Sequence, residues 1–431
     1  MARESSTSKV ILASSIGTTI DYYDLFIAGF TAATVWPSVF YPVLLAPIAI
    51  ALSIVTYVVP FLLKPFGAFL FGHFGDKYGR KPMLILTLLM MGISAAGIGL
   101  TPSYASIGIA APLLIVAFRA LFGIGAGGEY GGAISWTSER VAGSKRRAFL
   151  TSWVLQAIPL GLALSTVSFF FAASAMTPAA FKSWGWRIPF LLGAAMVVLA
   201  IFIRLRLEDS PLFLRLKKTG TTDKKPAITV LRLKAKRIML LSALVAFAPT
   251  VITLESVPFS LNYLSINGFK ISFIAFSIFI GSVFGVLTGI IGAILGDKYG
   301  RKPVALLSAS LTLISSPIFF LLINTGNGLM VILAQMLLLG SAFMVIGVLP
   351  AILSENFGTK YRYSGVGLSN NIGGVVTAVA TILESVIIAG ISGVVNAWPY
   401  VALLSMAISA LSIIAMLFLK ETKDVNLSAI R

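Results

Sequence analysis

Cysteine is absent from this 431-residue sequence, and it contains a single histidine. The chain therefore has no disulfide framework, thiol nucleophile or Cys-based metal site, and no His/Cys cluster indicates a metal or haem. The phosphate-binding pattern G-x-x-x-x-G-K-[ST] of ATP-driven pumps is also missing. We expect no metal and no other cofactor. We also expect the driving force to come from a gradient.

Charge is scarce as well, because charged residues make up 11% of the chain and hydrophobic residues 58%. A soluble domain of this length cannot bury so much apolar surface, so the composition predicts a polytopic membrane protein. The formal net charge of +18 would suggest nucleic acid in a soluble chain. Here the basic residues follow the membrane topology, so the expected partner is the lipid bilayer and not nucleic acid.

Apolar segments of spanning length, at least ~20 residues, recur twelve times along the chain. The first six lie near 10–34, 45–72, 83–101, 112–138, 149–174 and 187–207. The last six lie near 238–265, 271–295, 303–323, 329–353, 364–393 and 398–419. The sequence predicts an all-α membrane protein with two six-helix bundles, 1–207 and 237–431, joined by a cytoplasmic basic linker at 208–236.

Most of the 33 Lys and Arg residues fall in connections on one side of the predicted spans. The opposite connections contain only Lys182, Arg187 and Lys270. The positive-inside rule then places both termini in the cytoplasm. We expect a multi-pass protein of the cell membrane that works as a monomer.

An internal repeat divides the chain into matching halves. The eight residues from Gly75 to Pro82 recur without change from Gly296 to Pro303, each copy between two apolar runs. A weaker match pairs Ser138-Glu139 and Arg146 with Ser354-Glu355 and Arg362. Two polar hairpins alone do not explain the identical order, so the sequence indicates a parallel duplication.

Several charged residues lie inside predicted spans, where each is costly unless it is paired or hydrated. They are Asp21, Asp24, Lys64, Arg119, Glu129, Glu255 and Glu384. Asp21 and Asp24 share a helix face, and at ~1.5 Å per residue Asp21 and Lys64 reach similar depth. Such a group can hold and release a proton, although a permanent buried ion pair is the alternative. For Glu384 a structural role is favoured, and Glu255 is left open.

Seven short patterns resemble the major facilitator superfamily and, within it, the metabolite:proton symporters of α-ketoglutarate, citrate, shikimate and proline/betaine. The superfamily patterns are Gly72-x-x-x-Asp76-Lys77-x-Gly79-Arg80-Lys81 and Arg119 followed by Gly123, Gly125 and Gly127. The symporter patterns are Asp21-Tyr22-Tyr23-Asp24, Lys64-Pro65-Phe66-Gly67, Gly127-Gly128-Glu129-Tyr130-Gly131-Gly132-Ala133, Gly185-Trp186-Arg187-Ile188-Pro189-Phe190 and Glu208-Asp209-Ser210-Pro211-Leu212-Phe213. Together they cover nearly the whole chain.

This resemblance implies the major facilitator fold, in which two bundles surround a central cavity that opens to each side in turn. Proton coupling would involve Asp21, Asp24, Lys64, Arg119 and Glu129. The cavity would be lined by Tyr22, Tyr23, Arg119, Gln156, Glu255, Asn262, Tyr263, Asn370 and Asn371. The cytoplasmic gate would be formed by Gly72, Asp76, Arg80, Glu139, Asp297, Arg301 and Glu355.

The function expected from these residues is secondary active transport rather than an enzymatic reaction. Arg119 and Lys64 favour an organic acid anion as the small-molecule substrate, taken up together with protons. The fifth span, around Gln156, lacks the Gly/Pro run of drug/proton antiporters, which favours uptake. A zwitterion such as proline or a betaine is the alternative substrate, and an uncoupled facilitator is the alternative mechanism.

Overall fold

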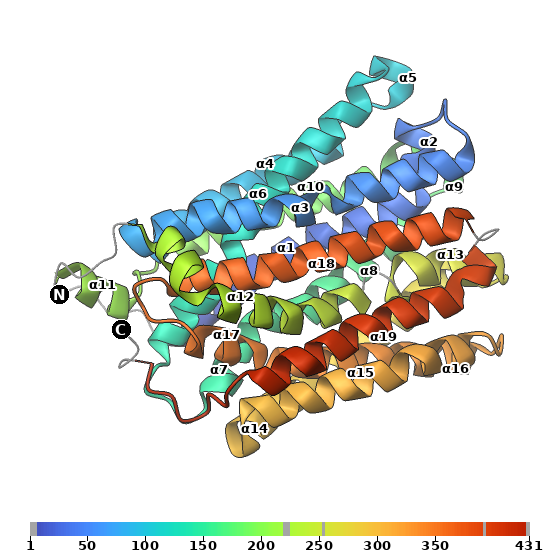
Figure 1. Ribbon diagram of the computed structural model, residues 1–431. Coiled ribbons are helices and arrows are strands. Elements are labelled where there is room, and N and C mark those ends of the chain that lie inside the picture. The colour runs from blue at the N-terminus through green and yellow to red at the C-terminus, as the bar shows by residue number, and fades with distance from the viewer. Residues whose placement is uncertain (1–6, 219–224, 252–254, 391–393, 428–431) are drawn as a thin grey trace.

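The computed structural model describes residues 7–218, 225–251, 255–390 and 394–427, which form helices joined by short connections (Figure 1). Within these ranges there is no β-strand. A chain that crosses lipid must satisfy its own backbone N–H and C=O groups, and a helix does so inside a single segment. The prediction of an all-α membrane protein is confirmed.

The first half of the chain contains six long helical segments and several short ones. They are α1 (Thr7–Thr34), α2 (Trp36–Phe40), α3 (Ala46–Tyr78), α4 (Arg80–Leu100), α5 (Tyr104–Ile107), α6 (Ala110–Arg140), α7 (Arg147–Leu155), α8 (Ala157–Ser174), α9 (Pro178–Ala180), the π-helical turn η1 (Phe181–Gly185) and α10 (Arg187–Leu205).

The second half repeats this order of long segments. It contains α11 (Pro211–Lys218), α12 (Pro226–Val251), α13 (Pro258–Ile266), α14 (Ile271–Tyr299), α15 (Arg301–Ile323), α16 (Gly328–Phe343), the 3₁₀ turn η3 (Met344–Gly347), α17 (Leu349–Glu355), α18 (Arg362–Gly390) and α19 (Val394–Phe418).

Ten of the helical segments in the described residues are long and apolar enough to cross a membrane. The two other long helices are α1 and α12, which carry charged residues: Asp21 and Asp24 lie in α1, and basic residues lie in the first part of α12. Together these segments account for the twelve predicted spans. The sixth span ends at Leu205, close to the predicted boundary.

The predicted basic linker at 208–236 is largely helical where the structure describes it. Helix α11 lies within it, and α12 already begins at Pro226 and bends at Lys234, which has non-helical backbone angles. Residues 219–224 lie outside the described part of the chain. Helix α12 thus begins before the predicted apolar span, because a helix can continue beyond the apolar segment, where hydropathy no longer marks it.

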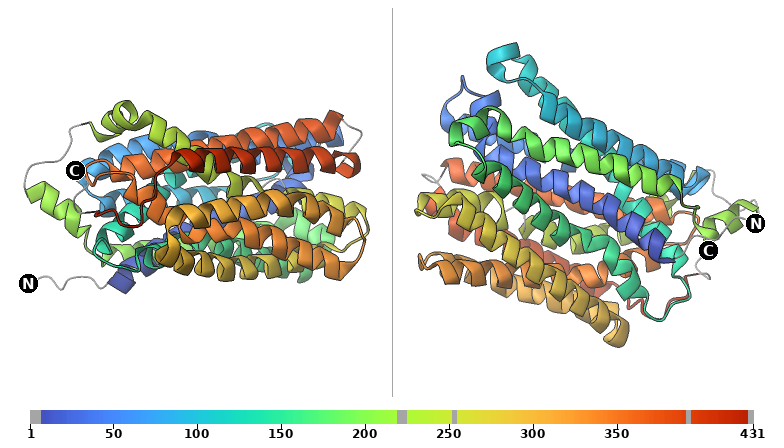
Figure 2. Two further views of the ribbon diagram at one scale, coloured as in Figure 1. Left: turned by 60° about the horizontal axis from the view of Figure 1, so that its bottom comes forward. Right: turned by 180° about the vertical axis from the view of Figure 1, so that it is seen from behind.

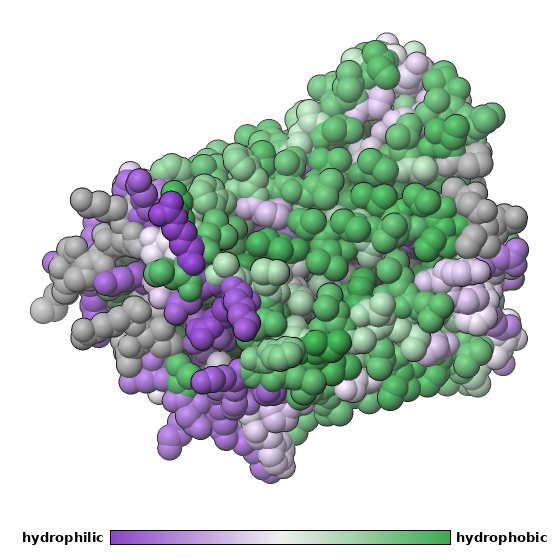
Figure 3. Space-filling view, viewed as in Figure 1, coloured by the Kyte–Doolittle hydropathy of each residue, from purple (hydrophilic) through white to green (hydrophobic). Residues whose placement is uncertain are grey.

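The long helices lie side by side, and α1 begins at the same end of the bundle at which α19 ends (Figure 2). Hydrophilic residues gather at this end, whereas apolar residues cover the length of the bundle (Figure 3). We call it the basic end, since Lys77, Lys81, Lys298 and Lys302 lie there. The two halves meet where α18 packs on α3 and α6, and where α14 packs on α7 and α8.

The octapeptides are not open hairpins, because only one residue in each interrupts the helices. Gly79 separates α3 from α4 with φ of 128°, and Gly300 separates α14 from α15 with φ of 115°. Residues with side chains rarely adopt such positive φ values, so both positions favour glycine. The consequence is that Asp76 and Asp297 lie on the last helical turn before the break, in fixed directions.

Candidate functional site

Lys64 and Asp21 form a buried ion pair between α3 and α1. The Lys64 Nζ lies 3.2 Å from Asp21 Oδ1 and 3.4 Å from Oδ2. Only 1% of Asp21 and 6% of Lys64 is exposed. The equal depth expected from the helical rise is therefore found, and the two charges stabilise each other where lipid and protein exclude water.

A second buried ion pair joins Arg119 of α6 to Asp24 of α1. The guanidinium donates from Nη1 to Asp24 Oδ2 at 3.1 Å and from Nη2 to the carbonyl of Tyr57 at 3.2 Å. Asp24 Oδ1 has no hydrogen-bond partner among the described residues. The carboxylate therefore keeps one free oxygen that can take a proton without first breaking the contact to Arg119.

Glu129, predicted with the same group, has a partner that sequence reasoning missed. Its carboxylate is paired with Arg204 of α10 and accepts a hydrogen bond from Thr87 Oγ1 at 2.9 Å. Arg204 also donates to the carbonyls of Leu84 and Ala13, so the pair ties α1, α4, α6 and α10 together. Sequence reasoning gave Arg204 no site role because it lies at the end of a span, yet it is fully buried.

A central cavity lies between the halves, beside Lys64. Tyr22, Asn370 and Asn371 line it as predicted, together with Lys64 and apolar residues of α1, α3, α8, α12, α16, η3 and α18. It has room for only a few water molecules (≈ 40 Å³). The structure therefore brings one cation, one phenol and two amides to a contracted space between the two bundles.

The other residues predicted to line the cavity lie outside it in this conformation. Arg119 is held by Asp24, and Tyr23 contacts Ser168 Oγ at 2.9 Å and the Pro189 carbonyl at 3.0 Å. Gln156 is buried at the break between α7 and α8, where neither of its amide atoms has a partner among the described residues.

The predicted cavity residues of the seventh span also point elsewhere. Glu255 accepts a hydrogen bond from Ser316 Oγ of α15 at 2.5 Å. The Tyr263 hydroxyl is hydrogen-bonded to Asn324, and Asn262 is half-buried on the same short helix. Sequence spacing could not separate these directions, because Glu255 and Ser256 have π-helical geometry, which shifts the faces of the helix.

At the basic end, Asp76 caps a helix of the other half. Its two oxygens accept the backbone N–H groups of Tyr363 at 3.2 Å and Ser364 at 2.9 Å, at the start of α18. A carboxylate at a helix N-terminus is stabilised by the unpaired N–H groups and by the helix dipole. Gly72 permits this approach, since a Cβ there would lie 2.8 Å from Ser364 Cα.

Asp297 makes the equivalent contact in the opposite direction. Its oxygens accept the N–H groups of Ala148 and Phe149, both at 3.0 Å, at the start of α7. Each octapeptide thus caps a helix of the partner half. Both Asp residues therefore lie against helix ends of the facing half.

Each cap is accompanied by a triad of Arg, Glu and Arg. Glu139 Oε1 accepts from Arg80 and from Arg362, both at 3.0 Å, and Arg362 belongs to the other half. Arg80 also donates to the Thr359 carbonyl at 2.9 Å, again across the boundary. A buried carboxylate between two guanidinium groups satisfies its own charge and holds two helices of different halves together.

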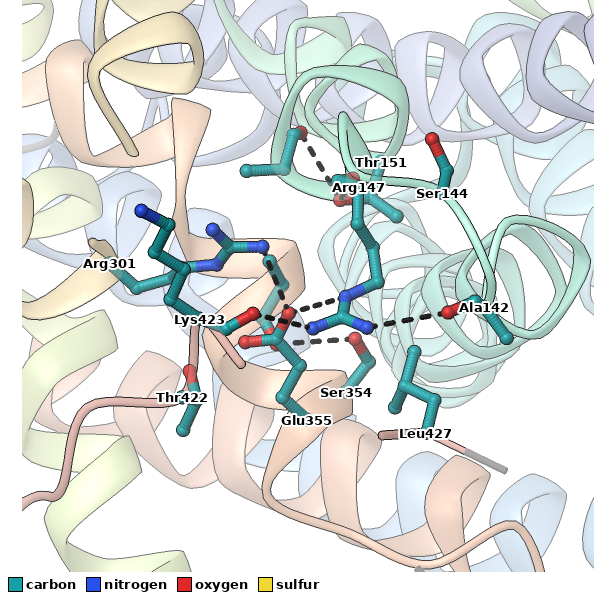
Figure 4. A network of polar contacts seen from close by, with 12 residues as sticks. Ala142, Ser144, Arg147, Thr151, Arg301, Ser354, Glu355, Thr422, Lys423 and Leu427 are labelled. Atoms are coloured by element: carbon teal, nitrogen blue, oxygen red, sulfur yellow. Dashed lines mark hydrogen bonds and ion pairs between the residues drawn. The ribbon is translucent and has the colours of Figure 1, made fainter. Parts of the chain in front are cut away.

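The second triad is centred on Glu355 and is shown in Figure 4. Glu355 Oε1 accepts from Arg147 Nε at 2.6 Å and from Arg301 at 3.2 Å. The sequence repeat matches Arg146 to Arg362, but in the structure the neighbouring Arg147 contacts Glu355. Helix α7 begins at Arg147, whose side chain is buried, whereas Arg146 is exposed.

Two further acids close the outer rim of the basic end, and sequence reasoning gave neither a role. Asp209 accepts the backbone N–H of Arg80 at 3.0 Å. Burial raises the pKa of the Asp209 carboxyl, although the backbone N–H groups that it accepts oppose the shift. Glu421 accepts the N–H groups of Arg301 and Lys302 at 2.9 Å. Partial burial alone would raise the pKa of the Glu421 carboxyl. The backbone N–H groups that it accepts have the larger effect, so the pKa lies below its usual value.

In the described residues, no group of three or more His, Asp or Glu side chains has the arrangement of a metal site. One buried ion pair, Asp21 and Lys64, borders the cavity through Lys64, and two symmetric sets of cross-half contacts join the bundles at the basic end.

Comparison with known proteins agrees with this geometry. The sequence pattern of the Major Facilitator Superfamily matches residues 15–381. The chain belongs to this superfamily. It is a transporter of small molecules and not an enzyme.

Two relatives within the superfamily match almost end to end. The inner membrane metabolite transport protein YhjE of Escherichia coli (strain K12) is 32% identical over 98% of this chain and 96% of its own. The shikimate transporter of the same strain is 32% identical over 97% and 96%. A third relative, the proline/betaine transporter of the same strain, is 31% identical over 90% of this chain and 77% of its own. The resemblance to metabolite symporters is confirmed.

Solved structures of the superfamily share the fold. The proton:xylose symporter XylE bound to 6-bromo-6-deoxy-D-glucose is 18% identical, covers 98% of both chains and gives a TM-score of 0.78. A partially occluded inward-open form of XylE from E. coli is 16% identical over 97% and 98% of the chains, with a TM-score of 0.76. The predicted fold class is thereby confirmed.

Proposed function

We propose that this major facilitator protein takes up a small organic acid together with a proton. The observation that carries the proposal is the ion pair between Asp21 and Lys64, in which the cation lines the central cavity and the acid lies behind it. A proton and an anionic substrate can therefore act on the two members of one buried pair.

The coupling follows from the cost of an unpaired buried charge. Protonation of Asp21 neutralises the partner of Lys64 and would leave the cation uncompensated, which costs several kcal/mol in such surroundings. An anion in the cavity removes this cost by replacing the carboxylate. Proton and anion consequently favour each other's binding, and a pH difference of one unit supplies about 1.4 kcal/mol to the loaded carrier.

Asp24 and Arg119 form the second part of the proposed mechanism. Asp24 is on the same face of α1 as Asp21, and one of its oxygens has no partner among the described residues and is available to accept a proton. A neutral Asp24 weakens the contact that holds α1 to α6 through Arg119. We assign to this pair the release of α1 when the carrier turns.

The caps and triads form the proposed gate. We infer that the basic end faces the cytoplasm, as the distribution of Lys and Arg indicates, and that this structure is the state closed to the cytoplasm. To open, the bundles must break the contacts of Asp76, Asp297, Glu139 and Glu355 across the boundary. At the opposite end a hollow of ≈ 270 Å³ lies between the halves, next to Thr34, Phe170 and Ile271.

A zwitterion such as proline or a betaine is the second candidate substrate. It is supported by the proline/betaine transporter among the relatives and by the acids of α1, which could meet its cation. In this structure both acids already hold a basic side chain, which favours the organic acid.

The test uses purified protein in liposomes that contain a pH-sensitive dye, challenged with small carboxylates and zwitterions. We expect one carboxylate to acidify the lumen with wild type and not with Asp24→Asn. Entry of labelled compound without proton movement, equal in the wild type and the variant, would show that the buried pairs only hold the helices.

A further inference from the structure

We infer that the substrate is a monocarboxylate with an apolar body and a hydrogen-bond donor, held between Lys64 of the first half and Asn371 of the second. This inference rests on the proposed function and narrows its substrate class. It is carried by the charge, the lining and the unpaired polar atoms of the central cavity.

The cavity offers a single cationic side chain. Lys64 lines it, whereas Arg119 is fully buried away from it between Asp24 and the Tyr57 carbonyl. A substrate with one carboxylate is neutralised by Lys64. A second carboxylate would enter a buried space without a cation to receive it, because no other Lys or Arg lines the described cavity.

The remainder of the lining is mainly apolar. Leu25 and Phe26 come from α1, Ile158 from α8, Val245 from α12 and Phe343 from α16. The Nζ of Lys64 also lies 5.8 Å from the centre of the Phe61 ring. This lining suits a hydrocarbon body and leaves the extra charged or heavily hydroxylated groups of other organic acids without partners.

Asn371 supplies the polar contact from the other half. Its amide nitrogen donates to the carbonyls of Gly127 at 2.9 Å and Gly367 at 2.8 Å, which fixes the side chain. Its Oδ1 is buried and accepts no hydrogen bond from the described residues. An unpaired buried acceptor on the cavity wall is satisfied by a ligand O–H or N–H. A hydroxyl on the substrate meets this requirement.

Such a substrate would also connect the bundles. Its carboxylate would bind α3 of the first half, and its hydroxyl would bind α18 of the second half. The helices α3 and α18 pack against each other across the boundary. A ligand that spans them favours the state in which the two halves are close around it, as a transported substrate must.

The test compares four-carbon acids of matched skeleton on the purified full-length protein: butyrate, 3-hydroxybutyrate, succinate and malate, with proline as the zwitterion. Binding is measured as the concentration-dependent rise of the unfolding temperature. We expect 3-hydroxybutyrate to bind best, butyrate next, and both dicarboxylates at least tenfold more weakly than their monocarboxylate counterparts.

Variants locate the contacts. Lys64→Met should abolish stabilisation by all the acids, Lys64→Arg should restore it, and Lys270→Met, at the exposed start of α14, should leave it unchanged. Asn371→Leu should remove the advantage of 3-hydroxybutyrate over butyrate and leave butyrate binding within about twofold. Since Lys64→Arg keeps the charge opposite Asp21, it distinguishes loss of binding from loss of folding.

The outcomes separate this inference from the proposed function. Equal or tighter binding of succinate or malate, or binding of proline alone, or of no acid at all, overturns the monocarboxylate assignment. If succinate binds and also acidifies loaded liposomes, proton symport stands and the assignment fails. If 3-hydroxybutyrate binds and enters without acidification, the assignment stands and symport fails.

Discussion

Asp76 accepts the backbone N–H of Ser364 at 2.9 Å although 288 positions separate them, and the bond crosses the boundary between the two bundles. Asp297 repeats the relationship with Phe149 in the opposite direction. A repeated octapeptide thus gives each half one acid that caps a helix of the other. In the proposed mechanism both caps stabilise the closed state of the basic end, and each can be tested alone.

Asp76→Asn should open the basic end more often. An amide keeps one acceptor oxygen but loses the second and the charge, at a cost of roughly 0.5–2 kcal/mol for a cap, which raises the open population about 2- to 30-fold. Because the chain has no cysteine, Asn370→Cys provides a single thiol in the cavity for labelling from that end. Asp424→Asn, at an exposed position in the C-terminal tail, is the matched control. Equal labelling in the two variants would show that Asp76 does not help to close the basic end.

Gly131→Val should also prevent closure, by bulk instead of charge. A Cβ at Gly131 would lie 2.8 Å from Gly367 Cα and from the Tyr363 carbonyl oxygen, where α6 meets α18. We expect spin labels at Lys77→Cys and Lys360→Cys to move apart by several ångströms, as measured by pulsed electron paramagnetic resonance. Gly143→Val is the control, since a Cβ there meets nothing within 4 Å. An unchanged distance in Gly131→Val would contradict this packing.

The pair of Glu129 and Arg204 should behave as a structural tie between helices. Glu129→Leu or Arg204→Met alone leaves an unpaired buried charge and should cost about 3–5 kcal/mol of stability. The double variant should recover much of this loss and retain proton-coupled uptake. Thermal unfolding measures the first effect and dye-loaded liposomes the second. A stable double variant that no longer moves protons would return Glu129 to the coupling group.

Glu421 should make the outer rim of the basic end sensitive to acid. The pKa of its carboxyl is lower in the folded chain than when unfolded, so its stabilising effect is complete above about pH 4.3, the usual Glu value, and is lost as pH falls through the folded pKa. The difference in unfolding temperature between wild type and Glu421→Gln should therefore shrink below that pH. A difference that stays constant down to pH 3 would show that the carboxylate charge does not contribute.

Much of this architecture was predictable because membrane chains repeat simple constraints. The spans follow from apolar length, and the two helix-capping acids, Asp76 and Asp297, follow from two identical octapeptides. The meeting of Asp21 and Lys64 follows from counting helical rise. The spans, the repeated acids and the depth of a charge in its helix all depend on the order of residues along the chain, which can be read from the sequence.

What could not be predicted depends on where a helix starts and which way a side chain turns. A shift of one residue decides between Arg146 and Arg147 as the partner of Glu355. Arg204 resembles any basic residue at the end of a span until α10 is seen to pack on α4. For Glu255, the local π-helical geometry turns the carboxylate toward Ser316 and away from the cavity. These directions come from packing between distant segments.

The most direct test of the account is a comparison of exchange with uphill uptake for Asp24→Asn. Proteoliposomes are loaded with the carboxylate that acidifies wild-type vesicles, and counterflow of labelled compound is measured beside its accumulation under a pH gradient. Glu384→Gln is the control, because Glu384 is also a buried acid but has no role in the proposed proton coupling. We predict that Asp24→Asn exchanges substrate but no longer accumulates it, whereas Glu384→Gln does both. Uphill accumulation by Asp24→Asn at the wild-type level would contradict proton coupling through the ion pair of Asp24 and Arg119.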